Sequence, residues 1–218
     1  MRLILIRHGE TDLNKRGRFQ GLDKVSLNSK GRAQAHDLSA VLPYDMPFAM
    51  YSSSLPRSLE TSNIISEKLL VDYDVVSELQ ELNIGALSGL NGEETRTLFP
   101  GLMEQWSNDP ASVQFPQGES LKQLQDRVWD AVLHFYSKHY DETVVIVSHN
   151  FAILTVVSKV VGIGLSNIRS LRQDLCGITR MEMTKDKYCL TSFNETMHLN
   201  KILPGDWSEK GTNFRKIS

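Results

Sequence analysis

Two histidines in the sequence follow directly after short apolar runs, where their side chains could take part in phosphate chemistry. Residues 3–6 are aliphatic and lead into Arg7 and His8, and residues 144–147 are also aliphatic and lead through one serine into His149. Because ligands bind outside the carboxyl ends of the strands in an open α/β sheet, we expect the two imidazoles to face each other there. An imidazole with a pKa of ~6.5 is partly neutral at physiological pH, and its neutral nitrogen is a competent nucleophile toward phosphorus.

Two arginines are expected beside these histidines and would make the site cationic. Arg7 precedes His8, and Arg57 lies near the start of a helix that should follow another strand of the sheet. A planar guanidinium group holds two oxygens of a phosphate at once, and a helix N-terminus adds free N–H groups. The two positive charges should also lower the pKa of His8 and favour the neutral ring that attacks. The intervening loop contributes the polar residues Asn14 and Gln20.

The elements that must position these residues alternate between strand-like and helix-like patterns, which favours a sheet with helices on its faces. Short apolar or β-branched runs predict strands at 3–6, 48–51, 74–76, 143–147, 178–183 and 188–193. The last two, with Lys185-Asp186-Lys187 between them, are typical of an antiparallel hairpin. We therefore predict an α/β fold, a three-layer α/β/α sandwich whose sheet is mixed and mostly parallel with an antiparallel edge.

Apolar residues at helical spacing predict four main helices between these strands. The first starts at an Asn28 or Ser29 cap, and the third starts at a Ser120 cap, because both residue types accept hydrogen bonds from a first helical turn. The second is expected to open with a Ser54 cap and Pro56, and to bury a stripe formed by Leu59, Ser62, Ile65 and Leu69. The fourth, over 151–161, is apolar enough to be a buried helix.

The segment from about 82 to 115 has no regular pattern, because it is broken by Gly85, Gly89, Gly92, Pro100, Gly101 and Pro110. We expect a loop with short helices near 93–98 and 102–106, which partly covers the site and selects the substrate. The sequence shows no internal repeat, low-complexity tract or linker composition. We therefore predict that residues 1–218 form a single domain.

Composition excludes several classes of protein. Of the 218 residues, 40% are apolar and 23% are charged, which is typical of a globular core, and the net charge of −2 offers no basic field for nucleic acid or an anionic membrane. The N-terminal apolar run is too short for a signal peptide, and residues 151–164 are shorter than the ~20 that a membrane helix requires. We expect a cytoplasmic protein without nucleic-acid or membrane partners. Cys176 and Cys189 are expected to be reduced thiols.

A zinc site is the main chemical alternative, since two histidines and a carboxylate can bind that ion. The sequence contains no HExxH spacing and no cluster of aspartates, and the two arginines would repel a cation. We therefore predict that the protein uses no metal and no cofactor. The other histidines have no comparable setting, and we expect surface or packing roles for His36, His134, His139 and His198.

Further motifs follow in a fixed order along the chain. They are Leu5 to Thr11 with Asn14, Gly17 to Gly21, Leu27 with Gly31 to Ala35, Ser53 to Arg57 with Thr61, Glu78 to Glu81 with Gly85 and Gly89, Gly118 to Ser120, Val147 to His149, and Phe193 to Thr196 with His198 and Leu199. This series resembles the histidine phosphatase superfamily, also called the phosphoglycerate mutase-like family, and it covers nearly the whole chain.

The resemblance implies roles for the residues at the predicted sheet edge. His8 would be phosphorylated and dephosphorylated in turn, while Arg7, Arg57 and His149 bind the phosphoryl oxygens. Asn14 matches a position that helps to line the phosphate pocket. We expect the substrate-binding set to be Arg7, Asn14, Gln20, Gly21, Arg57, Glu81, His149 and Asn150. Asn150 stands where many members have glycine, so its side chain could narrow the pocket or add a hydrogen bond.

Glu81 matches the proton donor of the family, which would protonate the leaving oxygen and later deprotonate a water molecule. A carboxyl group that performs both tasks needs a raised pKa, and a partly enclosed site could supply it. Glu78 is an equally available carboxylate by position alone. We interpret Glu119 and Ser120 as a helix cap and a supporting pair with an occasional phosphate contact.

The departures from the family favour a phosphatase over a mutase. The mutases carry a His-Tyr-Gly stretch and a basic, proline-containing insertion, whereas this chain has Asn83-Ile84-Gly85 and no such insertion before Gly118. Residues 85–90 still resemble the mutase branch. We therefore predict a phosphomonoesterase that acts on a small phosphorylated metabolite, with two alternatives: a cofactor-dependent phosphoglycerate mutase, and a catalytically silent phospholigand- or protein-binding module. A homodimer is the default assembly.

Overall fold

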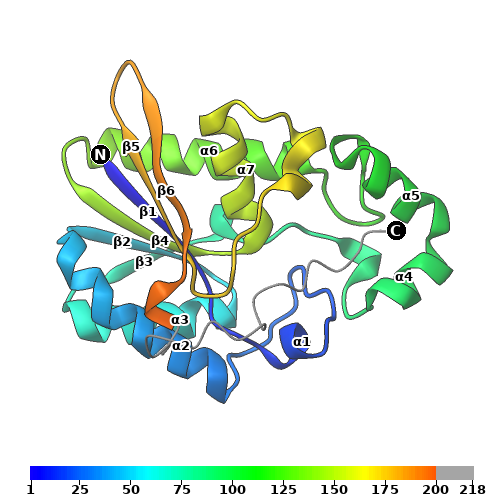
Figure 1. Ribbon diagram of the computed structural model, residues 1–218, viewed down its shortest axis with the longest axis horizontal. Helices are drawn as coiled ribbons and strands as arrows, with labels where there is room; N and C mark the ends of the chain where they lie inside the picture. Colours follow the sequence, from blue (N-terminus) through cyan, green and yellow to red (C-terminus); the bar gives the residue numbers. More distant parts are fainter. Residues whose placement is uncertain (200–218) are drawn as a thin grey trace, which may run out of the picture.

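Short runs of aliphatic and β-branched residues form the six strands of one sheet, in the computed structural model that describes residues 1–199 (Figure 1). The strands are β1 (Arg2–Arg7), β2 (Ala49–Ser53), β3 (Tyr73–Val76), β4 (Thr143–Ser148), β5 (Ile178–Met183) and β6 (Tyr188–Glu195). They lie in the order β3-β2-β4-β1-β5-β6. The part of the single-domain prediction that concerns residues 200–218 lies outside the described residues.

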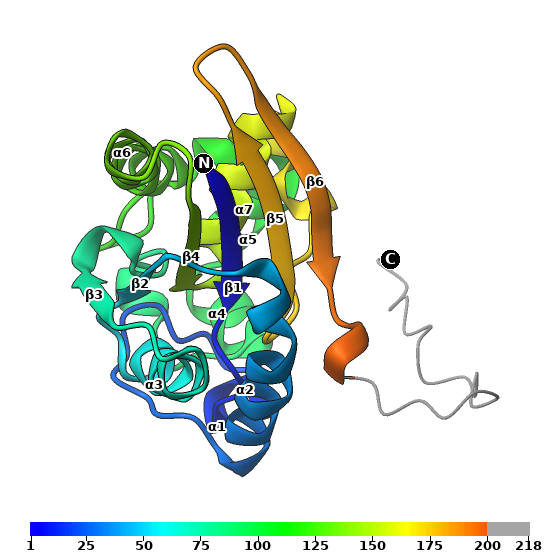
Figure 2. The same cartoon turned by 90° about the vertical axis from the view of Figure 1, so that its left-hand side faces the viewer.

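The register of the sheet brings three strand ends to the same edge. β1 and β4 are parallel, with Arg7 opposite Ser148, and β2 is parallel to β4, with Ser52 opposite Val147. β5 and β6 are antiparallel neighbours beyond β1 and project past the other strands (Figure 2). The predicted mixed sheet with an antiparallel edge is therefore confirmed, and His8 and His149 each follow a strand that ends at the shared edge.

Helices cover both faces of the sheet, with α6 and α7 above it and α2 and α3 below it in Figure 1. The helices are α1 (Asp12–Lys15), α2 (Ser29–Val41), α3 (Pro56–Leu69), α4 (Gly92–Leu98), α5 (Pro100–Asn108), α6 (Leu121–Lys138) and α7 (Asn150–Val161). Asn28 accepts a hydrogen bond from the N–H of Gly31, and Ser120 accepts one from Gln123, so both predicted caps are confirmed. α5 begins at Pro100, two residues before the predicted start, because proline is well tolerated in a first helical turn.

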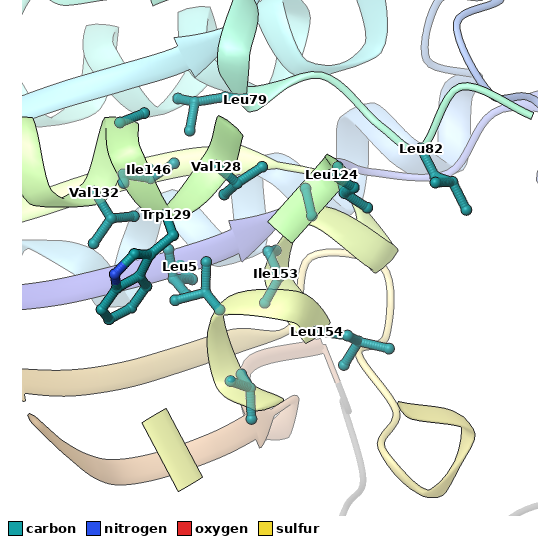
Figure 3. Close-up of a cluster of buried hydrophobic side chains, with 14 of the residues drawn as sticks. Leu5, Leu79, Leu82, Leu124, Val128, Trp129, Val132, Ile146, Ile153 and Leu154 are labelled. Carbon is teal, nitrogen blue, oxygen red and sulfur yellow. The ribbon is translucent and has the colours of Figure 1, made fainter. Parts of the chain in front are cut away.

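The alternation of side chains along β1 divides the core between the two faces. Leu3 and Leu5 pack with the apolar faces of α6 and α7, and Figure 3 shows Leu5 among Val128, Trp129 and Ile153. The intervening residues of β1 pack instead with α2 and α3. Strands that are buried on both faces are held in one register, which fixes the residues at their ends.

Two expectations for α3 were wrong. Its N-cap is Leu55, which makes no side-chain cap, while the Ser54 hydroxyl accepts a hydrogen bond from the amide of Gln80 at 2.7 Å. Leu59 and Leu69 are only half-buried. The buried face consists of Arg57, Ser58, Thr61, Ser62 and Ile65. The first turns of α3 lie against the polar edge of the sheet rather than against its apolar face, so small polar residues are buried there.

The loop after β1 is pressed against α2 at two glycines. A Cβ atom on Gly9 would lie 2.4 Å from the carbonyl oxygen of Gly31, and one on Gly31 would lie 2.1 Å from that of Glu10. Both distances are shorter than any real contact, so only glycine permits this approach, which fixes the backbone immediately after His8. Over residues 1–199, none of the helices combines the length and the hydrophobicity that crossing a membrane requires.

Candidate active site

A cavity of about 220 Å³ opens at the carboxyl edge of the sheet, where β1, α3 and α7 meet. Eight of the predicted site residues lie on its wall: Arg7, His8, Asn14, Gln20, Gly21, Arg57, Glu81 and Asn150. The wall also includes Arg18, Phe19, Leu82, Ile84 and Phe151, which the sequence interpretation did not assign to the site. His149 lies behind the wall, with its ring centroid 5.1 Å from that of His8.

His8 is buried and held in one orientation. Its Nδ1 lies 2.7 Å from the carbonyl oxygen of Gly9, so Nδ1 carries the hydrogen and Nε2 keeps the lone pair. Burial holds the pKa of His8 well below its ordinary value, and the charges of Arg57 and Arg7 lower it further. The lowering of the His8 pKa by the two arginines was expected from the sequence. The larger lowering by burial depends on how other residues pack around the ring. The ring is neutral and has a nucleophilic nitrogen.

Arg57 is completely buried and binds backbone as well as His8. Its Nε donates to Nε2 of His8 at 3.2 Å, and its two terminal nitrogens donate to the carbonyl oxygens of Asp23 and Gly21, each at 2.8 Å. Burial lowers the pKa of Arg57 to about 10, so the side chain stays positively charged at neutral pH. We expected the guanidinium group of Arg57 to bind phosphate directly. In the structure its terminal nitrogens are bonded to the loop, and the group places its positive charge beside His8.

Two buried nitrogen atoms of the predicted site have no partner among the described residues. Arg7 donates from one terminal nitrogen to the carbonyl of Gln173 at 2.6 Å, but its Nε is unpaired. Nε2 of His149 lies 2.7 Å from the hydroxyl of Ser53 and 3.2 Å from that of Ser58, while its Nδ1 is unpaired. An unsatisfied buried polar atom is costly, so this pair indicates a place for a ligand with acceptor oxygens.

Glu81 reaches the cavity from the segment after β3. Its Oε1 accepts hydrogen bonds from the N–H groups of Leu82 at 2.8 Å and Phe151 at 3.1 Å. Phe151 belongs to the first turn of α7, so the carboxyl group lies at a helix N-terminus. Burial raises the pKa of Glu81 and outweighs the opposing effects of these N–H groups and of Arg57 and Arg7. Glu78, the alternative carboxylate, is exposed.

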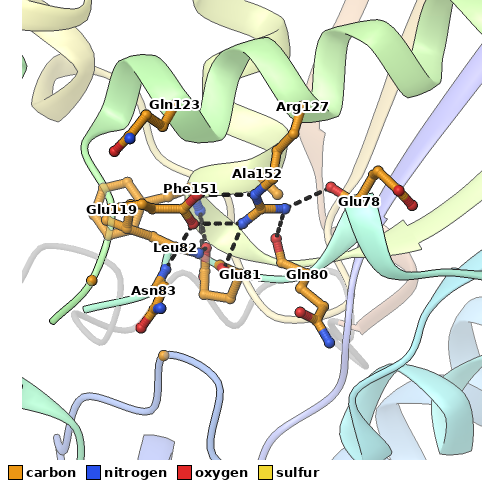
Figure 4. Close-up of polar contacts among 12 residues, drawn as sticks. Glu78, Gln80, Glu81, Leu82, Asn83, Glu119, Gln123, Arg127, Phe151 and Ala152 are labelled. Carbon is orange, nitrogen blue, oxygen red and sulfur yellow. Dashed lines mark hydrogen bonds and ion pairs between the residues drawn. The ribbon is translucent and has the colours of Figure 1, made fainter. Parts of the chain in front are cut away.

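Arg127 on α6 holds the segment that carries Glu81 (Figure 4). It donates to the carbonyl oxygens of Glu78 at 2.6 Å, Gln80 at 2.9 Å and Glu81 at 2.9 Å, and it pairs with the Glu119 carboxylate at 2.6 Å. The sequence interpretation missed this contact, because one arginine beside an apolar helical stripe is indistinguishable from a surface residue. Glu119 is the supporting residue that was expected, but it supports the Glu81 segment and lies off the cavity wall.

Asn14 of α1 and Gln20 of the loop after this helix complete the cavity. The side-chain oxygen of Asn14 accepts the N–H of Thr11 at 3.1 Å, and that of Gln20 accepts the Thr11 hydroxyl at 2.9 Å. These contacts leave the NH2 groups of Asn14 and Gln20 for a ligand. Asn150 is the first residue of α7 and is half-buried at the cavity rim.

The remaining histidines and the cysteines lie away from this cavity. His36 and His134 are exposed, His139 is bonded to the Tyr51 hydroxyl at 2.7 Å, and His198 is bonded to the carbonyl of Cys176 at 3.0 Å. Surface and packing roles are therefore confirmed for these four. Cys176 and Cys189 are both free thiols. Within residues 1–199, no three side chains of histidine, cysteine, aspartate or glutamate are grouped as metal ligands.

Comparison with known proteins places this geometry in context. Residues 3–196 match the family model described as histidine phosphatase superfamily (branch 1). The chain is 30% identical to phosphoserine phosphatase 1 of Hydrogenobacter thermophilus over 93% of this chain and 96% of that protein. It resembles the structure of Bacillus stearothermophilus YhfR with a TM-score of 0.87 and 27% identity, covering 91% and 99% of the two chains. A mycobacterial glucosyl-3-phosphoglycerate phosphatase in complex with VO3 aligns with a TM-score of 0.82 and 25% identity, covering 89% and 99%.

Proposed function

The chain belongs to the histidine phosphatase superfamily (branch 1), and we propose that it hydrolyses small phosphomonoesters through a phosphohistidine formed on His8. The single observation that carries the assignment of residues is that neutral His8 lines the cavity beside Arg7, whose buried Nε is unpaired, and has its ring 5.1 Å from that of His149, whose buried Nδ1 is unpaired. A phosphoryl group in this cavity would accept a hydrogen bond from Nε of Arg7 while phosphorus faces His8, and it would accept one from His149 in the tautomer whose Nδ1 carries the hydrogen and whose Nε2 accepts from the serine hydroxyls.

The first step transfers the phosphoryl group to the enzyme. Nε of Arg57 releases Nε2 of His8, whose lone pair attacks phosphorus. The N–P bond forms, and the bond from phosphorus to the ester oxygen breaks. Arg7 and Arg57 stabilise the charge that spreads over the phosphoryl oxygens in the transition state. The Gly9 carbonyl accepts the hydrogen of Nδ1 throughout, and it stabilises the positive ring that the step creates.

Glu81 exchanges a proton with the substrate in both steps. Its raised pKa keeps part of the enzyme in the protonated form, which gives its proton to the leaving alkoxide oxygen. The resulting carboxylate then accepts a proton from water, the water oxygen attacks phosphorus, and the N–P bond breaks to release inorganic phosphate. Glu81 returns to its protonated state, and His8 returns to its neutral state.

Turnover of p-nitrophenyl phosphate in the presence of EDTA tests the proposed activity. We expect release of nitrophenol that is unaffected by the chelator, because every group in the scheme is a side chain or backbone atom. Complete dependence on added metal would remove the proposal. Interconversion of phosphoglycerates that is stimulated by 2,3-bisphosphoglycerate, without net hydrolysis, would assign the chain to the mutases instead.

The pH dependence of kcat/KM follows from the two shifted groups. His8 must be neutral, and its lowered pKa means that this form persists well below pH ~6.5. Glu81 must be protonated, and its raised pKa means that activity falls as the pH rises through that pKa. We therefore expect an acidic optimum for alkyl phosphates, measured from about pH 4 to about pH 9. An acidic limb with its midpoint near or above the ordinary histidine pKa would contradict the proposed state of His8.

Replacing Arg127 by lysine should impair Glu81 without touching the substrate. Lysine keeps the charge but cannot donate to three carbonyl oxygens and Glu119 together. We expect kcat for an alkyl phosphate to fall about tenfold or more, with little change in KM, because the carboxyl group loses its fixed position. Lys122→Ala is the matched control, since Lys122 is an exposed ion-pairing residue of the same helix. A lower melting temperature with unchanged kcat and pH profile would limit Arg127 to a structural role.

The homodimer and the cytoplasmic location stay predictions from the sequence. Sedimentation analysis of the purified full-length chain tests the first, and fractionation of the producing cells tests the second.

A further inference from the structure

A second cavity, of about 80 Å³, lies beside the first, and its wall is apolar. The wall is formed by Phe19, Leu82, Ile84, Leu87, Met103, Trp106, Phe115 and Phe151. Most of these residues come from the irregular segment between α3 and α6, and Met103 and Trp106 come from α5. The segment that covers the phosphate cavity therefore also encloses an apolar space.

The two cavities adjoin each other. Phe19, Leu82, Ile84 and Phe151 line both of them. A phosphoryl group at His8 would therefore direct the ester oxygen and its organic group toward this shared wall. The backbone N–H groups of Leu82 and Phe151 bind Glu81, so the proposed proton donor stands where the two cavities join.

Aromatic rings that contact one another form one side of the apolar cavity. The Trp106 ring lies 5.5 Å from that of Phe151 in an edge-on arrangement and 5.5 Å from that of Phe115 in a tilted one. Leu82 and Leu87 are fully buried behind them. Edge-on and offset ring pairs are the geometries that aromatic side chains prefer, and an apolar, aromatic wall is typical of pockets that bind organic groups.

Charged groups near the cavities are already engaged. The phosphate cavity has four charged wall residues among those described: Arg7, Arg18, Arg57 and Glu81. Arg7, Arg57 and Glu81 have roles at phosphorus and the ester oxygen. Arg18 is paired with both oxygens of Glu94, at 2.9 and 3.1 Å, and donates to the carbonyl of Gly89 at 2.6 Å. On the described walls, a carboxylate or ammonium group of a substrate therefore finds no unengaged group of opposite charge.

We propose that the apolar cavity binds the alcohol portion of the substrate, so that the enzyme prefers phosphomonoesters with an alkyl or aryl group over phosphorylated amino acids and sugar acids. This specificity rests on the proposed function, because it requires the phosphoryl group to lie at His8. The organic group gains by leaving water for the apolar wall, whereas a charged group in the apolar cavity would lose its hydration without gaining an ion pair or a hydrogen bond.

A series of straight-chain alkyl phosphates, from methyl to hexyl, measures the effect directly. The leaving alcohols from ethyl upward differ little in basicity, so changes in kcat/KM along the series report binding of the chain. We expect kcat/KM to rise about fourfold for each added methylene until the cavity is filled. Propyl phosphate should exceed phosphoserine, which has the same carbon skeleton with two added charges, by at least about tenfold.

Met103→Asp tests the cavity itself. Met103 lines it from α5, and a carboxylate there should flatten the chain-length dependence while methyl phosphate turnover changes by less than about twofold. Leu98→Asp is the matched control, because Leu98 is 61% exposed at the end of α4, and it should keep the full dependence. If Met103→Asp does not fold, the wild-type series alone decides the question.

The outcomes separate this inference from the proposed function. Turnover of p-nitrophenyl phosphate with a flat alkyl series, or with phosphoserine preferred to propyl phosphate, would overturn the specificity and leave the phosphatase intact. Failure to hydrolyse any phosphomonoester would remove the proposed function itself. A rising series that Met103→Asp flattens and Leu98→Asp preserves supports the inference.

Discussion

Replacing His8 by glutamine is expected to reduce kcat for p-nitrophenyl phosphate by at least about 10⁴-fold, because the variant lacks the nitrogen that attacks phosphorus. Glutamine is close in size to histidine and offers an amide, which is not a nucleophile. Arg7, Arg57 and His149 remain in place, so inorganic phosphate should still bind with an affinity within about tenfold of the wild type. Steady-state kinetics and calorimetric titration with phosphate measure the two quantities.

His36→Gln is the matched control for this substitution, because His36 is exposed on α2 and makes no contact with the cavity. It should leave both quantities unchanged. If His8→Gln kept more than about a tenth of the wild-type kcat, direct attack by water would replace the covalent scheme. Loss of phosphate binding together with kcat would instead indicate a damaged fold, which circular dichroism would reveal.

Replacing Glu81 by glutamine is expected to lower kcat/KM for alkyl phosphates by about 10²- to 10⁴-fold, and kcat/KM for p-nitrophenyl phosphate by less than about tenfold. An alkoxide needs a proton in order to leave, whereas nitrophenolate is stable enough to leave without one. Glutamine keeps an oxygen for the N–H groups of Leu82 and Phe151, so the segment should retain its position. The measurement is kcat/KM, which reports phosphoryl transfer to His8 and not the later hydrolysis, for a series of esters whose leaving groups differ in basicity.

Glu78→Gln provides the comparison, since Glu78 lies on the same segment but is exposed. It should not change the dependence on the leaving group. Equal slowing of good and poor leaving groups in Glu81→Gln would assign the proton to another residue. The alkaline limb of the pH profile should also disappear in Glu81→Gln, because the group that titrates there has been removed.

The arrangement of the sheet could be predicted because it depends on local patterns. Aliphatic runs that end in a polar residue define β1 and β4, and a parallel pair necessarily brings His8 and His149 to the same edge. The helix caps Asn28 and Ser120 could also be predicted, since a cap forms hydrogen bonds only with residues close to it in the chain. The hairpin at the sheet edge followed from two β-branched runs separated by a short charged turn.

Features that depend on distant contacts could not be predicted. The guanidinium group of Arg57 donates hydrogen bonds to the carbonyl oxygens of Gly21 and Asp23. Nothing in the sequence spacing of these residues indicates those hydrogen bonds. Ser54 looked like a helix cap, but its hydroxyl is taken by Gln80, which lies on another segment. The large effect of burial on the pKa of His8 depends on the packing around the ring, which the sequence does not encode locally.

The covering segment was the least predictable part of the site. Its glycines and prolines indicated short pieces, and α4 and α5 formed close to the expected positions. The apolar cavity arises only when Met103 and Trp106 of α5 meet Phe19, Phe115 and Phe151 from three other parts of the chain. A segment without a regular hydrophobic pattern does not indicate which of its side chains will contact one another in the fold.

Trapping the phosphorylated enzyme tests the central claim most directly. The enzyme is mixed with a phosphomonoester labelled in its phosphoryl group, quenched within a single turnover, and digested for peptide mapping. We expect a base-stable, acid-labile phosphoryl group on the imidazole of His8, formed at least as fast as steady-state turnover and absent in His8→Gln. Active enzyme that carries no such group, or carries it on another residue, would contradict the account.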